Sequence, residues 1–183
     1  VLSQSSAGLV ILGLLAFYLK EIDQKKLYWL NIVALGMFGV GFLIGMLHLG
    51  HPFRAINIIF GIGRSPMSNE SVLSGAFGGL LLATIFLTFK LKFLLAKYCN
   101  IATAVVALIF AWSTTNVYHF ETVPTWGNSF TPFQMWMTVL MGGGAVALSM
   151  GAKKTGAIAL LLGSVLSLLF KPEYFTFINQ VAP

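Results

Sequence analysis

Charged residues and cysteine are both scarce in this chain of 183 residues. Only 9% of the residues are charged, with 5 Asp or Glu against 11 Lys or Arg, whereas 57% are hydrophobic. So little charge excludes a soluble domain and indicates a protein of the lipid bilayer. The single cysteine, Cys99, excludes an internal disulfide and a cysteine-held metal cluster, so any iron–sulfur centre belongs to another chain.

Long apolar runs take the place of the missing charge. A helix needs about 20 apolar residues to cross the hydrocarbon layer, and these runs lack the alternation that a strand would show. The sequence therefore predicts an all-α, polytopic transmembrane helical bundle that forms one domain over 1–183. We place its six spans at 1–19, 27–49, 72–89, 101–118, 132–150 and 157–170.

Glycines four residues apart are typical of closely approaching helices in membranes, and Gly41 with Gly45 and Gly75 with Gly79 show this spacing. At the ends of the chain we expect truncation. The sequence opens on Val1 without a methionine or a basic region, so we interpret it as beginning inside its first helix rather than with a signal peptide. Residues 171–183 run on without a charged tail, and we expect this end to be incomplete too.

The cationic residues fall into two unequal groups when alternate connections between spans are compared. The larger group consists of Lys20, Lys25, Lys26, Lys90, Lys92, Lys97, Lys153 and Lys154, and the smaller of Arg54, Arg64 and Lys171. By the positive-inside rule the lysine-rich connections are cytoplasmic, which places the connections 50–71 and 119–131 on the outer face. The net charge of +6 is then a topology signal, and nucleic acid is not an expected partner.

The stretch 47–71 concentrates ionisable groups. We expect a short interfacial helix that begins at Pro52 and ends before Gly61, and a third span capped by Ser68. His48 and Glu70 flank this connection, and an imidazole and a carboxyl at a membrane boundary can accept the two protons that a quinol releases on oxidation.

These residues also have plainer interpretations. Glu70 fits an acidic residue favoured near a helix N-terminus, and His48 fits an interfacial histidine with a backbone partner. Arg54 and Arg64 fit lipid headgroup contacts. Composition permits quinol chemistry without selecting it.

Three motifs in order resemble one known family. They are "MLHLGHPFRAIN" (46–57), "GRSPMSNES" (63–71), and "VYHFETVPTWGNSFTP" (117–132) followed by "MGGG" (141–144). Together they resemble the membrane-anchor subunit of the dimethyl sulfoxide reductase family, over five of the six spans. Members of that family have eight helices, so the resemblance implies that the last two are missing here. They hold a molybdopterin catalytic subunit and an iron–sulfur subunit to the bacterial inner membrane, and they oxidise menaquinol for anaerobic respiration.

The resemblance implies roles for individual residues. The histidine of the HLG motif is His48 and the acid of the SNE motif is Glu70, and these are the expected catalytic pair of the menaquinol site. Arg54 and Tyr118 are expected to bind the quinol, and Arg64 and Trp126 to contact a partner subunit. No metal ligand, haem or iron–sulfur cluster is expected in this chain, and no terminal reductase activity without its partners.

Two other functions stay open at this point. His48 and His119 both end a span on the same side, so they could be axial ligands of a haem b in a quinol subunit, although the resembled family carries no haem. A small transporter would need ionisable residues near the midplane of the membrane. The predicted spans contain no Asp, Glu, Lys or Arg, which argues against a transporter.

Overall fold

The computed structural model describes residues 1–47, 60–119, 123 and 125–181, and it is built from helices throughout this part of the chain. The helices are α1 (Leu2–Tyr18), α2 (Gln24–Leu47), α3 (Pro66–Phe89), α4 (Phe93–Val117), α5 (Phe130–Ser149) and α6 (Lys153–Val181). By length and hydropathy α2, α3, α4 and α6 can each cross a membrane, and α1 is an apolar helix of 17 residues. The predicted all-α membrane bundle is confirmed.

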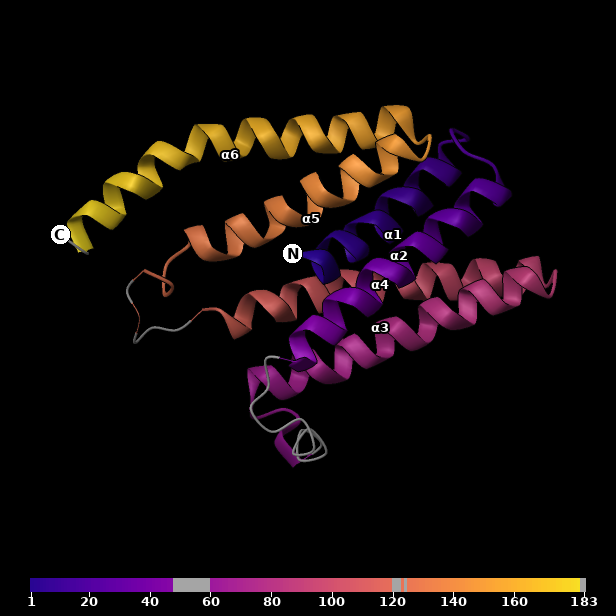
Figure 1. The fold of residues 1–183 in the computed structure, drawn as a ribbon, viewed down its shortest axis with the longest axis horizontal. Helices are drawn as coiled ribbons and strands as arrows, with labels where there is room; N and C mark the ends of the chain where they lie inside the picture. Colours follow the sequence, from indigo (N-terminus) through magenta and orange to yellow (C-terminus); the bar gives the residue numbers. More distant parts are fainter. Residues whose placement is uncertain (48–59, 120–122, 124, 182–183) are drawn as a thin grey trace.

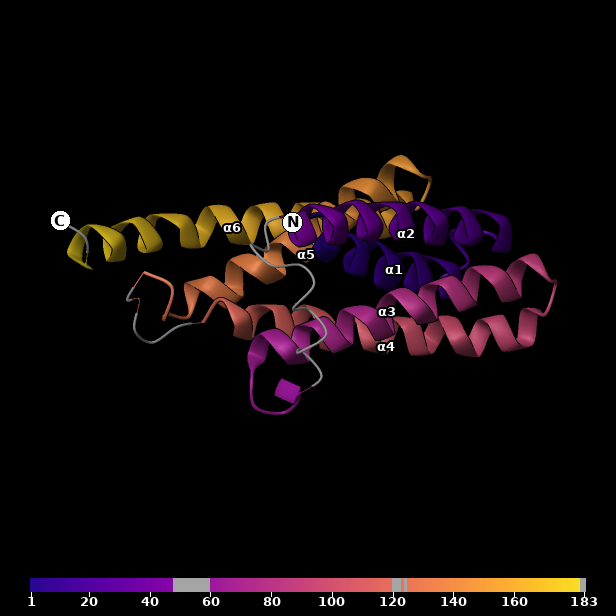
Figure 2. The same cartoon turned by 60° about the horizontal axis from the view of Figure 1, so that its bottom comes forward.

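Consecutive helices run antiparallel and lie side by side, so the turns of the bundle gather at two ends (Figures 1 and 2). One end, called here the lysine-rich end, carries the tight turns at 19–23, 90–92 and 150–152. At the other end, called here the loop end, α2 and α4 finish and α3 and α5 begin. The lysines that cluster in alternate connections of the sequence therefore lie together at one end of the fold.

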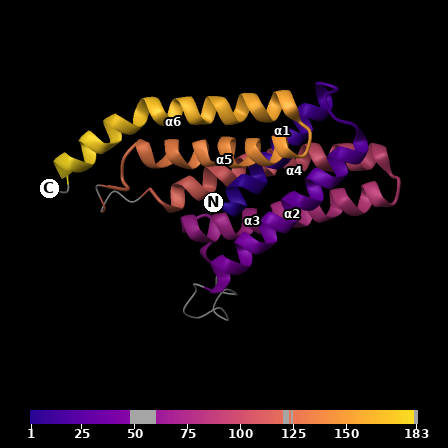
Figure 3. The same cartoon turned by 45° about the horizontal axis from the view of Figure 1, so that its top comes forward.

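Helix α1 occupies the centre of the bundle, with α2, α4, α5 and α6 packed against it (Figure 3). Most of its side chains are buried, including Ala7, Leu9 and Ala16, which are completely covered. The polar residues of its first turns are buried too, and the Ser6 hydroxyl donates a hydrogen bond of 2.6 Å to the Ala34 carbonyl oxygen of α2. In hydrocarbon such a bond satisfies groups that water cannot reach.

Backbone-to-backbone contacts join α1 to α5 and α5 to α6 through glycine. A Cβ atom at Gly8 would overlap the carbonyl oxygen of Val139, and a Cβ atom at Gly143 would lie 2.5 Å from the carbonyl carbon of Gly8. A Cβ atom at Gly156 would lie 2.5 Å from the backbone nitrogen of Leu148. Only glycine permits these approaches, because every other residue carries a Cβ atom at that position. Such close contacts hold helices together in lipid, which offers no hydrophobic drive to bring looser surfaces together.

The predicted glycine pairs are mostly wrong as contact points. Gly45, Gly75 and Gly79 face open space, with nothing within 4 Å of the position that a methyl group would take, whereas Gly41 approaches α1 and Gly78 approaches the ring of Phe38. A four-residue spacing identifies one face of a helix, but it does not say whether that face meets another helix or lipid.

Several helices extend beyond the predicted span limits, because polar residues next to the apolar runs are helical too. Ser68 is not the N-cap of α3, because Pro66 occupies the first helical position and Ser65 precedes it as the N-cap. Helix α6 continues through Pro172 to Val181, and it bends toward its C-terminal end (Figure 1). Proline removes one backbone hydrogen bond and kinks a helix without always ending it. The span limits within the membrane stay a prediction.

Glu21, in the turn between α1 and α2, binds the N-terminus of α6. Its carboxylate accepts hydrogen bonds from the backbone N–H groups of Lys154 and Thr155 and from the Thr155 hydroxyl, the last at 2.6 Å. Partial burial raises the pKa of Glu21, but these hydrogen bonds and the charge of Lys154 outweigh burial and lower that pKa below its usual value. The turn at one corner of the bundle thereby caps a helix 133 residues away in sequence.

Replacing Gly143 by Ala should destabilise the bundle by about 1–3 kcal/mol, because the new methyl group meets the backbone of Gly8 and must push α1 away from α5. Unfolding by denaturant in detergent micelles, followed by circular dichroism, measures this loss. Gly39→Ala is the matched control: its methyl group enters open space, and helix propensity predicts no loss and a gain of up to about 1 kcal/mol. Equal stability of the two variants would contradict the contact.

Replacing Glu21 by Gln should lower stability at pH 7 by about 1–2 kcal/mol, because a charged cap on α6 is lost. Since the folded-state pKa lies below the unfolded one, the stabilisation is present above the unfolded value of about 4.3 and disappears as pH falls through the folded value. Unfolding of both proteins from pH 7 to pH 3 should therefore show the difference closing in acid. A difference that does not depend on pH would refute the role of the carboxylate charge.

Candidate functional site

Helices α3 and α4 meet along one seam, called here the α3–α4 seam, whose residues recur at alternating steps of three and four. On α3 these residues are Glu70, Ser74, Phe77, Leu81, Thr84 and Thr88, and on α4 they are Asn100, Thr103, Ala107, Phe110, Thr114 and Val117. The Phe77 and Phe110 rings stack at 5.7 Å between centroids, and the Thr84 and Thr103 hydroxyls lie 3.1 Å apart. This is the spacing of antiparallel helices packed side by side.

Glu70 occupies the position of the seam nearest the loop end. It is partly buried, and its Oε1 atom accepts a hydrogen bond of 3.0 Å from the Thr114 hydroxyl. The other carboxyl oxygen, Oε2, has no hydrogen-bond partner among the residues that the structure describes. The predicted acid, Glu70, therefore lies at a helix interface, two helical turns before Phe77. Its Oε2 atom can still accept a proton or a hydrogen bond from a ligand.

Thr114 is the site residue that sequence reasoning missed. Its hydroxyl proton is shared between Glu70 Oε1 and the Phe110 carbonyl oxygen, at 3.0 Å each, and its side chain is buried. The available signal was the polar run Ser113 to Asn116 at the end of an apolar span. Matching this run to the third predicted span would have placed Thr114 opposite Glu70. Residues that recur every seven positions on two antiparallel helices can face each other along one seam.

Tyr118 follows directly after α4, one helical turn beyond Thr114, and is 40% exposed. Its ring contacts Trp126, with centroids 6.1 Å apart. Trp126 is 47% exposed in the loop before α5. Two predicted residues with different expected roles, quinol binding and partner contact, thus touch each other at the loop end.

Arg64 lies in a turn that leads into α3 and is exposed. The backbone of this turn is held by hydrogen bonds from Arg64 N–H to the Gly61 carbonyl oxygen, at 3.0 Å, and from Gly63 N–H to Asn69 Oδ1, at 2.7 Å. The turn fixes the chain that precedes Glu70 and leaves the Arg64 side chain facing outward. His119, one of the two histidines of the haem alternative, is exposed immediately after Tyr118.

His48 and Arg54 lie outside the described residues, as do residues 52–59 of the predicted interfacial helix. Leu47, the last described residue before them, ends α2 at the loop end, where α3 with Glu70 begins (Figure 1). In the part of the protein that the structure describes, no three His, Cys, Asp or Glu side chains come close enough to hold a metal ion.

An aromatic cavity of about 300 Å³ opens between α5 and α6 toward the loop end. Its lining includes Phe130, Phe133, Phe170, Lys171 and Tyr174, and the ring centroids of Phe133 and Phe170 lie 5.1 Å apart. Sequence reasoning did not find it. Its signal is the aromatic spacing at the start of the fifth span and the end of the sixth, which antiparallel neighbours bring together.

Comparison with known proteins covers nearly the whole sequence. The family model described as the DMSO reductase anchor subunit (DmsC) matches residues 1–180. The C chain of the anaerobic dimethyl sulfoxide reductase of Haemophilus influenzae is 31% identical over 78% of this protein and 53% of its own length. The YnfH chain of an anaerobic dimethyl sulfoxide reductase of Escherichia coli is 34% identical over 80% of this protein and 53% of its own length.

The C chain of the anaerobic dimethyl sulfoxide reductase of Escherichia coli is 40% identical over 73% of this protein and 49% of its own length. The protein thus spans about half the length of the curated relatives it matches. No solved structure matches it. With one family model along almost all of its residues and three such relatives, this chain belongs to the DMSO reductase anchor subunit (DmsC) family.

Proposed function

We propose that this protein anchors a DMSO reductase-like molybdoenzyme to the bacterial inner membrane and oxidises menaquinol at the loop end of the bundle. The observation that supports this most directly is Glu70, a carboxyl in the α3–α4 seam with one oxygen bound to Thr114 and the other open to a ligand. The three relatives are named as chains of anaerobic dimethyl sulfoxide reductases, and the letter C in two of these names implies further subunits.

The proposed chemistry is the loss of two electrons and two protons from the quinol. One ring hydroxyl hydrogen-bonds to Glu70 Oε2 and releases its proton to that carboxylate, and the other releases its proton to the imidazole of His48. Both electrons pass to an iron–sulfur cluster of a partner subunit, which delivers them to the molybdopterin subunit. Glu70 and His48 then return their protons to water. The quinone leaves into the lipid.

The division of charge between the two ends of the bundle supports an orientation. Eight lysines lie at or near the lysine-rich end, so the positive-inside rule assigns that end to the cytoplasm and the loop end to the outer face. The protons of the quinol are then released outside. The soluble subunits dock on the same face, where they can receive the electrons over a short distance.

Residues around Glu70 take supporting roles in this proposal. Tyr118, one turn beyond Thr114, lines the quinol site, and Arg54 helps to position the ring. The exposed side chains of Arg64 and Trp126 contact the iron–sulfur subunit. Both stand at the loop end on either side of the seam, since Arg64 precedes α3 and Trp126 follows α4.

Glu70→Gln should reduce quinol-dependent substrate reduction by at least about 100-fold in membranes that hold the complete complex, because an amide cannot accept the proton. It can still accept the Thr114 hydrogen bond, so the fold is kept. Reduction with an artificial donor to the soluble subunits should be unchanged. The control is Glu173→Gln, an exposed carboxyl of α6, which should leave quinol activity intact. Full quinol activity in the Glu70 variant would refute the proposal.

Thr114→Val should lower quinol-dependent kcat/KM by about tenfold, because the carboxyl of Glu70 loses the one described hydrogen bond that orients it. Thr114→Ser keeps the hydroxyl and should restore most of the activity. A purely structural role would instead make the Ser and Val variants equally unstable in detergent without separating their kinetics. The measurement is steady-state oxidation of a menaquinol analogue by the complete complex.

A further inference from the structure

A second cavity lies at the lysine-rich end, opposite the proposed quinol site. Its volume is about 650 Å³, and it is formed by the last turn of α1, the turn that follows, the first turn of α2 and the beginning of α4. It is lined by Phe17, Tyr18, Lys20, Glu21, Ile22, Asp23, Lys26 and Lys97. Three lysines therefore share this cavity with the aromatic and aliphatic side chains of Phe17, Tyr18 and Ile22.

The two carboxylates of this cavity, Glu21 and Asp23, cap helix N-termini. Glu21 binds the backbone N–H groups at the start of α6, as described above. Asp23 is placed just before α2, and its Oδ1 atom accepts a hydrogen bond of 2.9 Å from the Lys26 backbone N–H. Among the residues that the structure describes, neither carboxylate forms an ion pair with Lys20, Lys26 or Lys97. The three lysines outnumber these two carboxylates, and their ammonium groups can therefore bind another anion.

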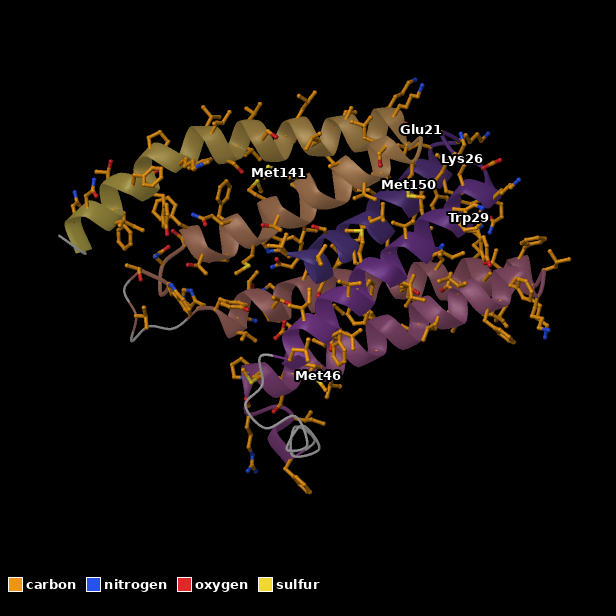
Figure 4. All side chains as sticks on the ribbon, in the orientation of Figure 1. Glu21, Lys26, Trp29, Met46, Met141 and Met150 are labelled. Carbon is orange, nitrogen blue, oxygen red and sulfur yellow. The ribbon has the colours of Figure 1, made fainter. Side chains whose placement is uncertain are left out.

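The backbone of the α1–α2 turn positions Lys20, and side-chain contacts position Lys26 and Lys97 at the same end. Lys20 has a positive φ of 59° at the end of α1, where its N–H bonds to the Phe17 carbonyl oxygen and the Glu21 N–H bonds to that of Ala16. The ammonium group of Lys97 lies 5.6 Å from the centre of the Tyr18 ring. The ammonium group of Lys26 points toward the turn between α5 and α6, close to Gly151. Figure 4 shows Glu21, Lys26 and Trp29 together at this end.

The surroundings of the cavity match a lipid rather than a soluble anion. Leu19, which precedes Lys20, and Leu94, one turn before Lys97 on α4, expose 64% and 70% of their surfaces, and exposed apolar side chains at this end suit contact with acyl chains. Trp29, exposed on α2, is an aromatic residue of the kind that sits at headgroup level. Basic pockets between helices near the membrane surface favour phosphate-bearing headgroups.

We propose that this cavity binds the phosphodiester headgroup of an anionic phospholipid. Lys20, Lys26 and Lys97 contact the phosphate oxygens, and the acyl chains follow the exposed leucines down the outside of the bundle. A bound lipid at this position bridges the α1–α2 turn to α4, two parts of the protein that share the cavity wall. The site is independent of quinol oxidation at the loop end.

The test uses the purified protein, stripped of lipid in neutral detergent, with dioleoyl phosphatidylglycerol as the probe and native mass spectrometry as the readout. The site variant carries Lys20→Gln, Lys26→Gln and Lys97→Gln. Since each lysine near the headgroup contributes about fivefold, its affinity for phosphatidylglycerol should fall about a hundredfold. The matched control carries Lys90→Gln, Lys92→Gln and Lys153→Gln, which change the net charge equally outside the cavity and should weaken binding less than threefold.

Further arms separate the sources of the phosphate. Dioleoyl phosphatidylcholine should bind at least tenfold more weakly than phosphatidylglycerol, and inorganic phosphate should not displace the lipid at equal concentration. Equal weakening of the site variant and the control would show bulk attraction and overturn the proposal, and so would displacement by inorganic phosphate. If the triple variant loses its helical circular dichroism, Lys97→Gln alone replaces it, with an expected loss of about fivefold against Lys92→Gln.

Discussion

The close contact between the backbones of α1 and α5 at Gly8 and Gly143 is the constraint on which the arrangement of the bundle depends. Helices in lipid are not driven together by water, so they associate where small residues let their backbones meet and dispersion forces add up. This contact and the Gly156 contact of α6 draw the α5–α6 hairpin onto one side of α1. Helix α1 can then bury its own polar first turns, because neighbours cover it on several sides.

The α3–α4 hairpin packs on the other side and follows a different rule. Its seam is filled by side chains of ordinary size, with stacked rings at Phe77 and Phe110 and a hydroxyl pair at Thr84 and Thr103. A carboxyl at the last position of this seam is costly to bury, and it is accommodated by the Thr114 hydroxyl and by nearness to the loop end. A group placed at such cost is a natural candidate for proton chemistry.

Charge separates the two ends of the bundle into different environments. At the lysine-rich end the carboxylates of Glu21 and Asp23 cap helices, so the lysines there are left without ion pairs among the described residues. At the loop end Lys and Arg are fewer, and the exposed side chains include the aromatic pair Tyr118 and Trp126. The proposed lipid site and the proposed quinol site therefore lie in environments of different charge.

The sequence by itself determined the helical membrane bundle and the family, since long apolar runs and local motifs depend only on neighbouring residues. It also singled out Glu70, whose functional role stays a prediction. Only the tertiary structure decided that Thr114 faces Glu70, that Glu21 caps α6, and that Gly8 rather than Gly75 meets another helix. These pairings depend on how each helix is rotated about its own axis. In a helix that is apolar on every side, the hydropathy pattern does not indicate which face meets another helix, because lipid and protein neighbours favour the same side chains.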